Sequence, residues 1–305
     1  MLSYLHGFHA GNSADVLKHS ALIFCLEYLK KKENPVLCVD THAGAGFYDL
    51  TEKSTHRNKE WEQGLGQLLQ TIKWSDKGAE GITGIPPMIA SYVKLICIEK
   101  NIPARYFGSP VIMAKILGKG DRLVCFELHP REAETLKASM AEIHGDVKPT
   151  IEVRREDGPE GLKALLPPPS RRGLILIDPS WEEKDEYENI PRAVESGLKH
   201  FPEGTFIIWY PLLALPKSKD SVSAPIQDVL FNLSKVKHCR LELNIRLPEF
   251  MVGPIEKSPR NMYGSGLVIY NPPWTLRSAL EETMPYLAKV LGEKGASWRL
   301  DWKDV

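Results

Sequence analysis

Short runs of apolar residues, each followed by a turn or an acidic residue, recur along this chain of 305 residues. The first run is Val36–Val39, which lies between Pro35 and the turn-forming stretch His42–Gly46. An apolar run with such boundaries is typical of a buried central strand. Six further runs of this kind cover residues 123–128, 151–156, 173–178, 205–211, 239–247 and 266–274. The pattern therefore predicts a sheet of seven strands.

Amphipathic segments between these runs predict helices. The helix before the first strand can begin near Ala14, with Asn12 or Ser13 as its cap, and end at the basic run Lys30–Lys32. Polar caps and C-terminal cations are common at helix ends. Because helical patterns also separate the early strands, we expect βαβ units and a mainly parallel α/β sheet.

Residues 49–108 have a different character. Segments 61–72 and 85–100 have the pattern of amphipathic helical pieces, and we find no convincing β run among them. The core pattern resumes at Ser109, a possible helix cap, with Pro110 at the first helical position. We therefore predict a core of residues 1–48 and 109–305, with a small helical subdomain of residues 49–108 inserted after the first strand.

Four successive predicted strands end on or next to an acid, namely Asp40, Glu127, Asp157 and Asp178. Acids are costly at a buried sheet edge unless they bind something. The small residues after Asp40 also allow a ligand to approach the backbone closely. In a dinucleotide fold the ribose-binding acid follows the glycine turn by about 20 residues, and removing the insertion brings Glu127 near that spacing. The four acids predict a nucleoside site at one sheet edge, where a single acid would predict only a cap.

The segment Asp178-Pro179-Ser180-Trp181 suits a planar base that carries an exocyclic amine. Asp178 and the carbonyl of Pro179 can accept the two N–H bonds of the amine and direct its lone pair toward an electrophile. Trp181 can stack on the base, a contact worth about 1–3 kcal/mol. The base must leave its helix to reach such a site. The alternative is that Asp-Pro-Ser forms an ordinary turn.

Composition narrows the class of protein. The chain has 39 Lys+Arg and 39 Asp+Glu, which argues against unspecific coating of nucleic acid but allows a local basic patch on a structured RNA. Candidate phosphate contacts, each equally explained as a solvated surface residue, are Arg154, Arg155, Arg171, Arg172, Lys217 and Lys219. The five cysteines form no CxxC pair, and we find no signal peptide or membrane span. We therefore expect a cytoplasmic protein without disulfides or zinc, and no membrane partner.

Polar residues are dense before the first predicted helix. The histidines at positions 6, 9 and 19 match no common metal-site spacing, so we predict no metal site. A polar arm with capping residues is one interpretation of this segment. We favour the interpretation that Lys18 and His19 face a ligand at the end of the first strand.

The chain resembles S-adenosylmethionine-dependent amino-methyltransferases, and more closely the RlmJ family of 23S rRNA adenine-N6-methyltransferases. The matching stretches are MLSYLHGFHAGNSADVLKH, VDTHAGAGFY, YFGSP, ELHP, SRRGLILIDP, WYP and NPPW. They are spread over nearly the whole chain and are weakest in residues 50–100 and 214–260. The resemblance implies a seven-stranded, Rossmann-like methyltransferase sheet with a small helical subdomain inserted after the first strand.

The resemblance also implies roles for individual residues. A pocket for S-adenosylmethionine would consist of Lys18, His19, His42, Ser109, Glu127, Asp157 and Gly158. Glu127 suits the ribose hydroxyls, and Asp157 suits the adenine amine. The catalytic residues would be Asp178, Pro179 and Trp181. Tyr4 would contact the substrate and gate the pocket, with Trp181 as a second substrate contact.

The implied activity is methylation of one adenine N6 in free or immature 23S rRNA. One departure concerns the tetrad, because the family pattern is DPPY and this chain has DPSW. Ser180 relaxes the restraint that a proline places on the residue before it. A non-catalytic or weakly active RNA-binding relative therefore remains an alternative, as do DNA adenine methylation and a role in the use of external DNA. A nicotinamide enzyme is disfavoured because Asp49 replaces the third glycine of GxGxxG.

A second tetrad, Asn271-Pro272-Pro273-Trp274, fits the amino-methyltransferase pattern better than DPSW does. It follows the last predicted strand, whereas the catalytic loop of the family follows the fourth. The family carries NPPW there in addition to its DPPY. We therefore interpret it as a structural turn.

Overall fold

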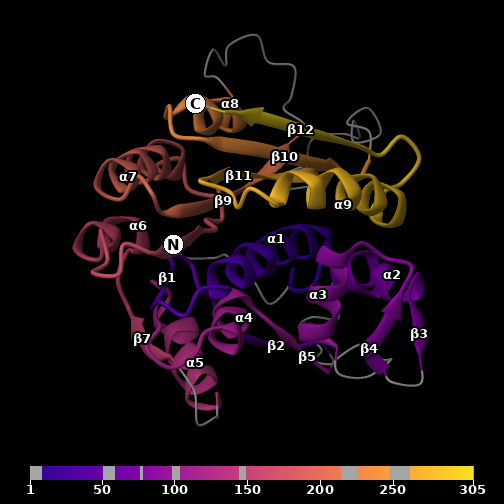
Figure 1. The fold of residues 1–305 in the computed structure, drawn as a ribbon, viewed down its shortest axis with the longest axis horizontal. Helices are drawn as coiled ribbons and strands as arrows, with labels where there is room; N and C mark the ends of the chain where they lie inside the picture. The colour runs from indigo at the N-terminus through magenta and orange to yellow at the C-terminus, as the bar shows by residue number, and fades with distance from the viewer. Residues whose placement is uncertain are drawn as a thin grey trace.

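A computed structural model describes residues 9–50, 59–75, 78–97, 104–143, 149–213, 225–246 and 262–304. Its centre is a mixed sheet of eight strands in the order β12-β10-β11-β9-β8-β1-β6-β7 (Figure 1). The strands are β1 (Leu37–Asp40), β6 (Arg122–Phe126), β7 (Thr150–Arg154), β8 (Gly173–Ile177), β9 (Thr205–Leu213), β10 (His238–Asn244), β11 (Met262–Tyr270) and β12 (Ser297–Lys303).

Five of these strands, from β9 to β7 in the sheet order, run parallel, and β11 is antiparallel to both β9 and β10. The carboxyl ends of the parallel strands therefore meet at one edge of the sheet. Every residue of β1 and β8 is buried, which is the expected burial for central strands covered on both faces.

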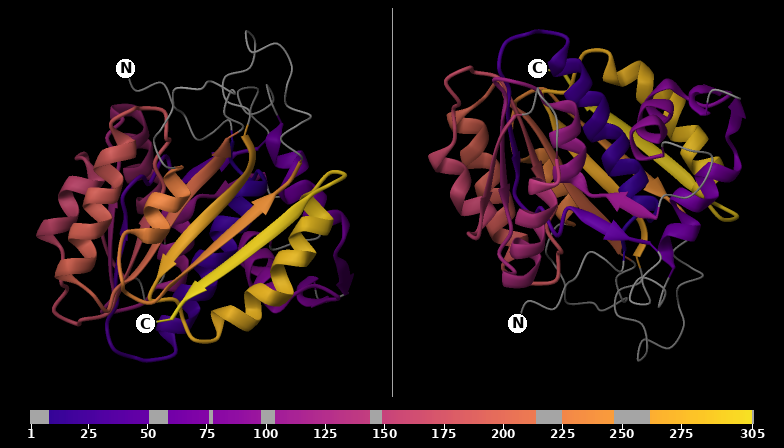
Figure 2. Two further views of the ribbon diagram at one scale, coloured as in Figure 1. Left: turned by 90° about the horizontal axis from the view of Figure 1, so that it is seen from above. Right: turned by 90° about the horizontal axis from the view of Figure 1, so that it is seen from below.

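Helices cover both faces of the sheet (Figure 2). One face packs against α1 (Ser13–Lys30), α4 (Ser109–Ile116), α5 (Pro130–Ala141) and α9 (Leu276–Leu291). The other face packs against α7 (Glu186–His200) and α8 (Ile226–Asn232), with the short α6 (Gly158–Gly161) and η4 (Leu162–Ala164) alongside α7. The sheet thus separates two apolar cores.

Helix α1 begins where its sequence predicts. The side chain of Asn12 accepts hydrogen bonds from the N–H groups of Ala14 and Asp15, each at 3.0 Å, and the helix ends at Lys30. Almost every side chain of its first three turns is buried, because α1 lies between the sheet and helices α3, α4 and α9. A polar side chain on α1 is therefore held inside the protein, and this burial fixes Lys18 and His19.

The predicted count of seven strands was wrong, because β12 adds an eighth. Trp298, Leu300 and Trp302 alternate with polar residues along β12, and the strand pairs with β10 at the edge of the sheet. Its residues are exposed or half-buried, so the stretch lacks the apolar run by which the other strands were predicted.

The expectation that residues 49–108 contain no β strand was also wrong. The segment after β1 contains α2 (Leu65–Gln70), α3 (Pro87–Ile96) and the 3₁₀ turn η3 (Glu60–Gln63), and it also contains four short strands. These are β2 (Phe47–Asp49), paired with β5 (Arg105–Phe107), and β3 (Lys73–Ser75), paired with β4 (Gly78–Thr83). Strands of three to six residues are too short for an alternating pattern to stand out.

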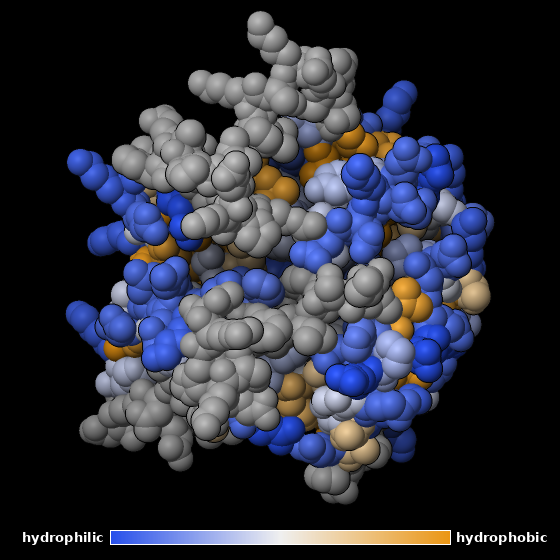
Figure 3. Space-filling view, turned by 180° about the vertical axis from the view of Figure 1, so that it is seen from behind, coloured by the Kyte–Doolittle hydropathy of each residue, from blue (hydrophilic) through white to orange (hydrophobic). Residues whose placement is uncertain are grey.

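The surface seen from behind is mainly hydrophilic, with small separate apolar patches among the described residues (Figure 3). Within the described ranges, no helix has both the length and the apolar character needed to cross a membrane.

Candidate active site

A cavity of about 480 Å³ opens at the edge where the parallel strands end. All seven residues predicted to hold the cofactor line it, and so does Asp178. These residues come from α1, from the segments that follow β1, β6, β7 and β8, and from the start of α4. The four strand-end acids were expected to gather at one edge, and three of them line this cavity.

The turn after β1 is held by Glu127. Its Oε2 accepts a hydrogen bond from the N–H of Gly44 at 2.8 Å, and its Oε1 accepts one from the N–H of His129 at 2.7 Å. Gly44 has a φ of 62°, and a Cβ there would lie 2.1 Å from the hydroxyl of Tyr48. Only glycine therefore fits this position, and the turn leaves the Glu127 carboxylate fixed at the cavity wall.

Asp157 and Gly158 form the wall beside β1. Asp157 caps α6 by accepting the N–H of Glu160 at 2.9 Å. A Cβ on Gly158 would lie 2.2 Å from the carbonyl oxygen of Thr41, so the two chain segments touch backbone to backbone. Ser109 does not cap α4 as the sequence suggested, since Gly108 occupies the cap position and makes no side-chain cap bond.

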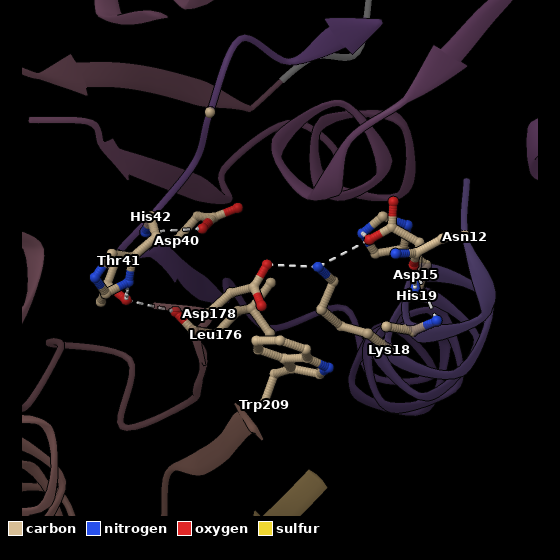
Figure 4. Close-up of polar contacts among 12 residues, drawn as sticks. Asn12, Asp15, Lys18, His19, Asp40, Thr41, His42, Leu176, Asp178 and Trp209 are labelled. Atoms are coloured by element: carbon tan, nitrogen blue, oxygen red, sulfur yellow. Dashed lines mark hydrogen bonds and ion pairs between the residues drawn. The ribbon is translucent and has the colours of Figure 1, made fainter. Parts of the chain in front are cut away.

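The most buried charges of the site lie between α1 and β8 (Figure 4). The Nζ of Lys18 lies 2.9 Å from Asp15 Oδ1 and 2.5 Å from Asp178 Oδ2, and the Lys18 side chain is only 4% exposed. Burial lowers the pKa of Lys18, but the two carboxylates outweigh it, so the pKa stays above its ordinary value. Lys18 is therefore a permanent cation that holds the Asp178 carboxylate in place.

His19 and His42 also line the cavity. The Nδ1 of His19 lies 2.8 Å from the hydroxyl of Tyr106, inside the protein. Burial lowers the pKa of His42 to about 4, and the hydroxyl of Thr41 lies 2.8 Å from its Nδ1. His42 is thus neutral at physiological pH and offers a hydrogen-bonding ring edge to a ligand.

Asp40 is fully buried at the end of β1. The pKa of Asp40 is raised to about 7, chiefly by burial and also by the charge of Asp178. The Ser109 hydroxyl, the N–H of His42 and the charge of Lys18 lower this pKa but do not outweigh burial. The folded protein therefore holds a proton on Asp40 that the unfolded chain releases above about pH 4. The stability of the fold should fall as the pH rises from about 4 to about 7.

Replacing Asp40 with asparagine should remove this pH dependence. Between pH 5.5 and pH 8.5 the native chain should lose about 2 kcal/mol of unfolding free energy through Asp40, and Asp40→Asn should not lose it. The stability of the variant minus that of the native chain should therefore rise by about 2 kcal/mol over this range. Urea unfolding at the two pH values measures it. The surface substitution Asp304→Asn is the control, because that side chain is 61% exposed. An equal difference at both pH values would show that Asp40 is ionised throughout.

The loop after β8 differs from the sequence-based expectation. Trp181 was predicted to stack on a substrate base, but its ring packs in the core and does not line the cavity. It is 2% exposed, and its Nε1 donates to the carbonyl of Trp209 at 3.0 Å. Burial of a large ring and a partner for its N–H explain this orientation. Pro179 does not line the cavity either, and Tyr4 lies outside the described residues.

Trp209 and Asp15 were missed as site residues. Trp209 lies on β9 next to β8, and its ring centroid is 6.0 Å from the Nζ of Lys18 (Figure 4). The WYP stretch was the available signal for Trp209. For Asp15 the signal was its spacing of three residues from Lys18, which places both on one face of a helix.

The second tetrad lies at the opposite edge of the sheet. The backbone N–H of Asn271 donates to the carbonyl of Lys237 at 2.8 Å, and the hydroxyl of Thr205, at the start of β9, donates to the carbonyl of Asn271 at 3.1 Å. The segment Asn271–Trp274 therefore connects β11 to α9 and is not among the residues that line the cavity.

The four described candidates for phosphate contacts, Arg154, Arg155, Arg171 and Arg172, do not form one patch. Arg171 pairs with Glu203, and Arg172 donates to the carbonyls of Leu29 and Asn34, both arginines lying just before β8 begins. Arg154 lies at the carboxyl end of β7, and Arg155 follows it, whereas Arg171 and Arg172 lie at the amino end of β8. Lys217 and Lys219 lie outside the described residues. Among the described residues no group of three or more His, Cys, Asp or Glu side chains is placed to bind a metal ion.

Comparisons with known proteins agree with one another. A family model described as "Ribosomal RNA large subunit methyltransferase D, RlmJ" matches residues 33–304. The chain is 38% identical over 307 residues to "Ribosomal RNA large subunit methyltransferase J" of Haemophilus influenzae, covering 99% of both chains. It is 34% identical over 309 residues to the protein of that name from Escherichia coli, covering 98% of this chain and 99% of the other. A crystal structure from Legionella pneumophila is similar with a TM-score of 0.77 and 30% identity, over 97% of this chain and 99% of that one.

Proposed function

The chain belongs to the RlmJ family of ribosomal RNA large subunit methyltransferases, and from this premise we propose that it transfers a methyl group from S-adenosylmethionine to the N6 of one adenine in 23S rRNA. The observation that carries the proposal is the position of Asp178. Its carboxylate, held by Lys18, lines the same cavity as Glu127 and Asp157.

The charges around the cavity fit this cofactor. Ten acidic side chains line the cavity, against three cationic ones. The acids are Glu127, Glu132, Glu156, Asp157, Glu160, Asp178, Glu182, Glu183, Asp185 and Glu186, and the cations are Lys18, Lys163 and Arg192. S-adenosylmethionine carries a sulfonium and an ammonium group, so an acidic cavity attracts it.

Individual residues suit its parts. Glu127 has both oxygens oriented by backbone N–H groups, and each oxygen keeps a lone pair for the ribose hydroxyls. Asp157 uses one oxygen as a cap and leaves the other for the adenine amine. Gly158 packs so closely on Thr41 that a side chain there would clash, and both residues line the cavity beside Asp157. His42, Ser109, His19 and Lys18 complete the cofactor set.

Asp178 performs the catalytic step in this proposal. The bound cofactor supplies an electrophilic methyl group. The Asp178 carboxylate accepts an N–H bond of the adenine N6, which localises the lone pair of the amine. The Pro179 carbonyl is the proposed second acceptor, although Pro179 does not line the cavity in this structure. Lys18 fixes the carboxylate through its buried ion pair. Positioning of this kind accounts for large rate effects, since small misplacements of reacting groups cost about 100-fold.

The acidic rim bears on the state of the substrate. It repels phosphates, so the RNA backbone should contact the protein away from the cavity while a single base enters it. A base must be unpaired and unstacked to do so. Free or immature rRNA is therefore the proposed substrate, and Tyr4 remains a proposed substrate contact.

The test is methyl transfer from labelled S-adenosylmethionine to protein-free 23S rRNA, with the modified nucleoside identified by mass spectrometry. N6-methyladenosine made by the native chain and absent with Asp178→Ala would support the proposal. Another methylated nucleoside, or no product while S-adenosylmethionine still binds, would contradict it.

Ser180 favours a second candidate, a weakly active RNA-binding relative. Its hydroxyl and N–H occupy the place of the second proline of the tetrad. A large gain in turnover for Ser180→Pro would favour this candidate, and a loss would oppose it. Single-stranded DNA of matching sequence, offered in the same assay, tests the remaining alternative of DNA methylation.

A further inference from the structure

The loop between β8 and α7 is closed by a contact between Ser180 and Glu186. The Oγ of Ser180 donates toward the Glu186 carboxylate and lies 3.2 Å from each of its oxygens. The same Oγ accepts the N–H of Glu182 at 3.1 Å. The carboxylate of Glu186 also accepts the N–H of Glu183 at 3.3 Å. The Ser180 hydroxyl and the Glu186 carboxylate therefore connect the start of the loop to its end, and each also binds an N–H from the middle of the loop.

Glu186 is well placed to hold these donors. It is the first residue of α7, where the helix dipole favours a negative charge. Burial raises its pKa, whereas the N–H of Glu183, the Ser180 hydroxyl and the N–H groups of Glu182 and Ser180 lower it, leaving it above the ordinary value. A half-buried carboxylate with several donors is a rigid acceptor.

The loop needs such a restraint because Trp181 is strained. Its φ is 55°, in the left-handed region that bulky residues rarely adopt. Strain of this kind persists only where the surroundings fix the conformation. Trp181 is fixed on its other side by Trp209 and by an edge contact with Tyr187, whose ring centroid is 5.3 Å away.

We propose that Glu186 is a positioning residue, which acts through Ser180 to fix the loop after β8 and so aim the Asp178 carboxylate at the substrate amine. This inference rests on the proposed function of Asp178. A proline at position 180 would restrain the chain covalently, by fixing its own φ and disfavouring helical geometry at Pro179. In this chain the hydrogen bonds between Ser180 and Glu186, which we call the Ser180–Glu186 clamp, supply that restraint. Glu186 therefore takes over the restraining role of the second proline in the family tetrad.

Hydrogen exchange tests the Ser180–Glu186 clamp without requiring methyl transfer activity. In Glu186→Gln, the amide N–H groups of Glu182 and Glu183 should exchange about tenfold faster, because the one neutral oxygen of glutamine holds the Ser180 hydroxyl and the N–H of Glu183 less firmly than a carboxylate does. The N–H of Glu182 follows because it donates to the Oγ of Ser180. Glu195→Gln is the matched control, since Glu195 lies on the same helix, does not belong to the loop and pairs with Lys199 on the surface. Unchanged exchange at Glu182 and Glu183 in Glu186→Gln would overturn the clamp, even if the chain proved inactive on rRNA.

Kinetics tests its role in positioning. Ser180→Ala and Glu186→Gln should each lower kcat about tenfold and change the Kd for S-adenosylmethionine less than threefold, whereas Ser180→Thr keeps a hydroxyl and should stay within threefold of native kcat. Because the two residues act as one unit, the double variant should lose no more than the worse single variant. Multiplying losses, or a weakened Kd that accounts for the whole effect, would overturn the proposal.

Discussion

Replacing Asp178 with asparagine is expected to lower kcat for methyl transfer by about 1,000-fold. The substitution keeps the shape of the side chain but exchanges one acceptor oxygen for an NH₂ donor, which repels the amine of the substrate. Groups that handle a proton or a lone pair in the transition state contribute about 10²–10⁴-fold. The Kd for S-adenosylmethionine should change less than threefold, because Glu127 and Asp157 hold other parts of the cavity wall.

The measurement is single-turnover methyl transfer at saturating cofactor, with cofactor binding followed by calorimetry. The control is Asp304→Asn, which makes the same chemical change at an exposed residue just after β12. Asp304 does not line the cavity, so this variant should leave kcat unchanged. If Asp178→Asn lost less than tenfold in kcat, another residue would accept the N–H bonds of the amine.

The convergence of the strand-end acids could be predicted from the sequence because the geometry of a parallel sheet guarantees it. Once β1, β6, β7 and β8 are parallel neighbours, their carboxyl ends share an edge whatever the loops do. The family predicted from the N-terminal block and the strand-end motifs is confirmed by the comparisons. The strands that were missed are short or lie at an exposed edge, so tertiary pairing and not an apolar pattern forms them.

The contacts within the site were less accessible to sequence reasoning. Lys18 and Asp178 are 160 residues apart, and only the packing of α1 across the sheet brings them together. The orientation of Trp181 depends on the partner that its N–H finds on β9. The Ser180–Glu186 contact depends on a loop that folds back on the start of α7. Each is a tertiary outcome that local propensity does not encode.

Lys18 is the second residue with a large expected effect. Its removal in Lys18→Met leaves the carboxylates of Asp15 and Asp178 buried without their cation. Breaking a buried ion pair by removing one partner typically costs about 3–5 kcal/mol. We therefore expect a loss of that size in the free energy of unfolding, together with a loss of methyl transfer similar to that of Asp178→Asn.

Lys30→Met is the matched control for stability, because it breaks an equally short ion pair on the same helix. Lys30 lies 2.5 Å from Asp121, but its side chain is 23% exposed, and Asp121 also accepts the N–H groups of Val36 and Gly118. Its loss should be less than half that of Lys18→Met in urea unfolding. Adding Asp15→Asn to Lys18→Met should recover part of the stability but none of the activity, since it removes one buried charge and leaves Asp178 unaimed. Recovery of methyl transfer in that double variant would show that Lys18 neutralises the site without orienting Asp178.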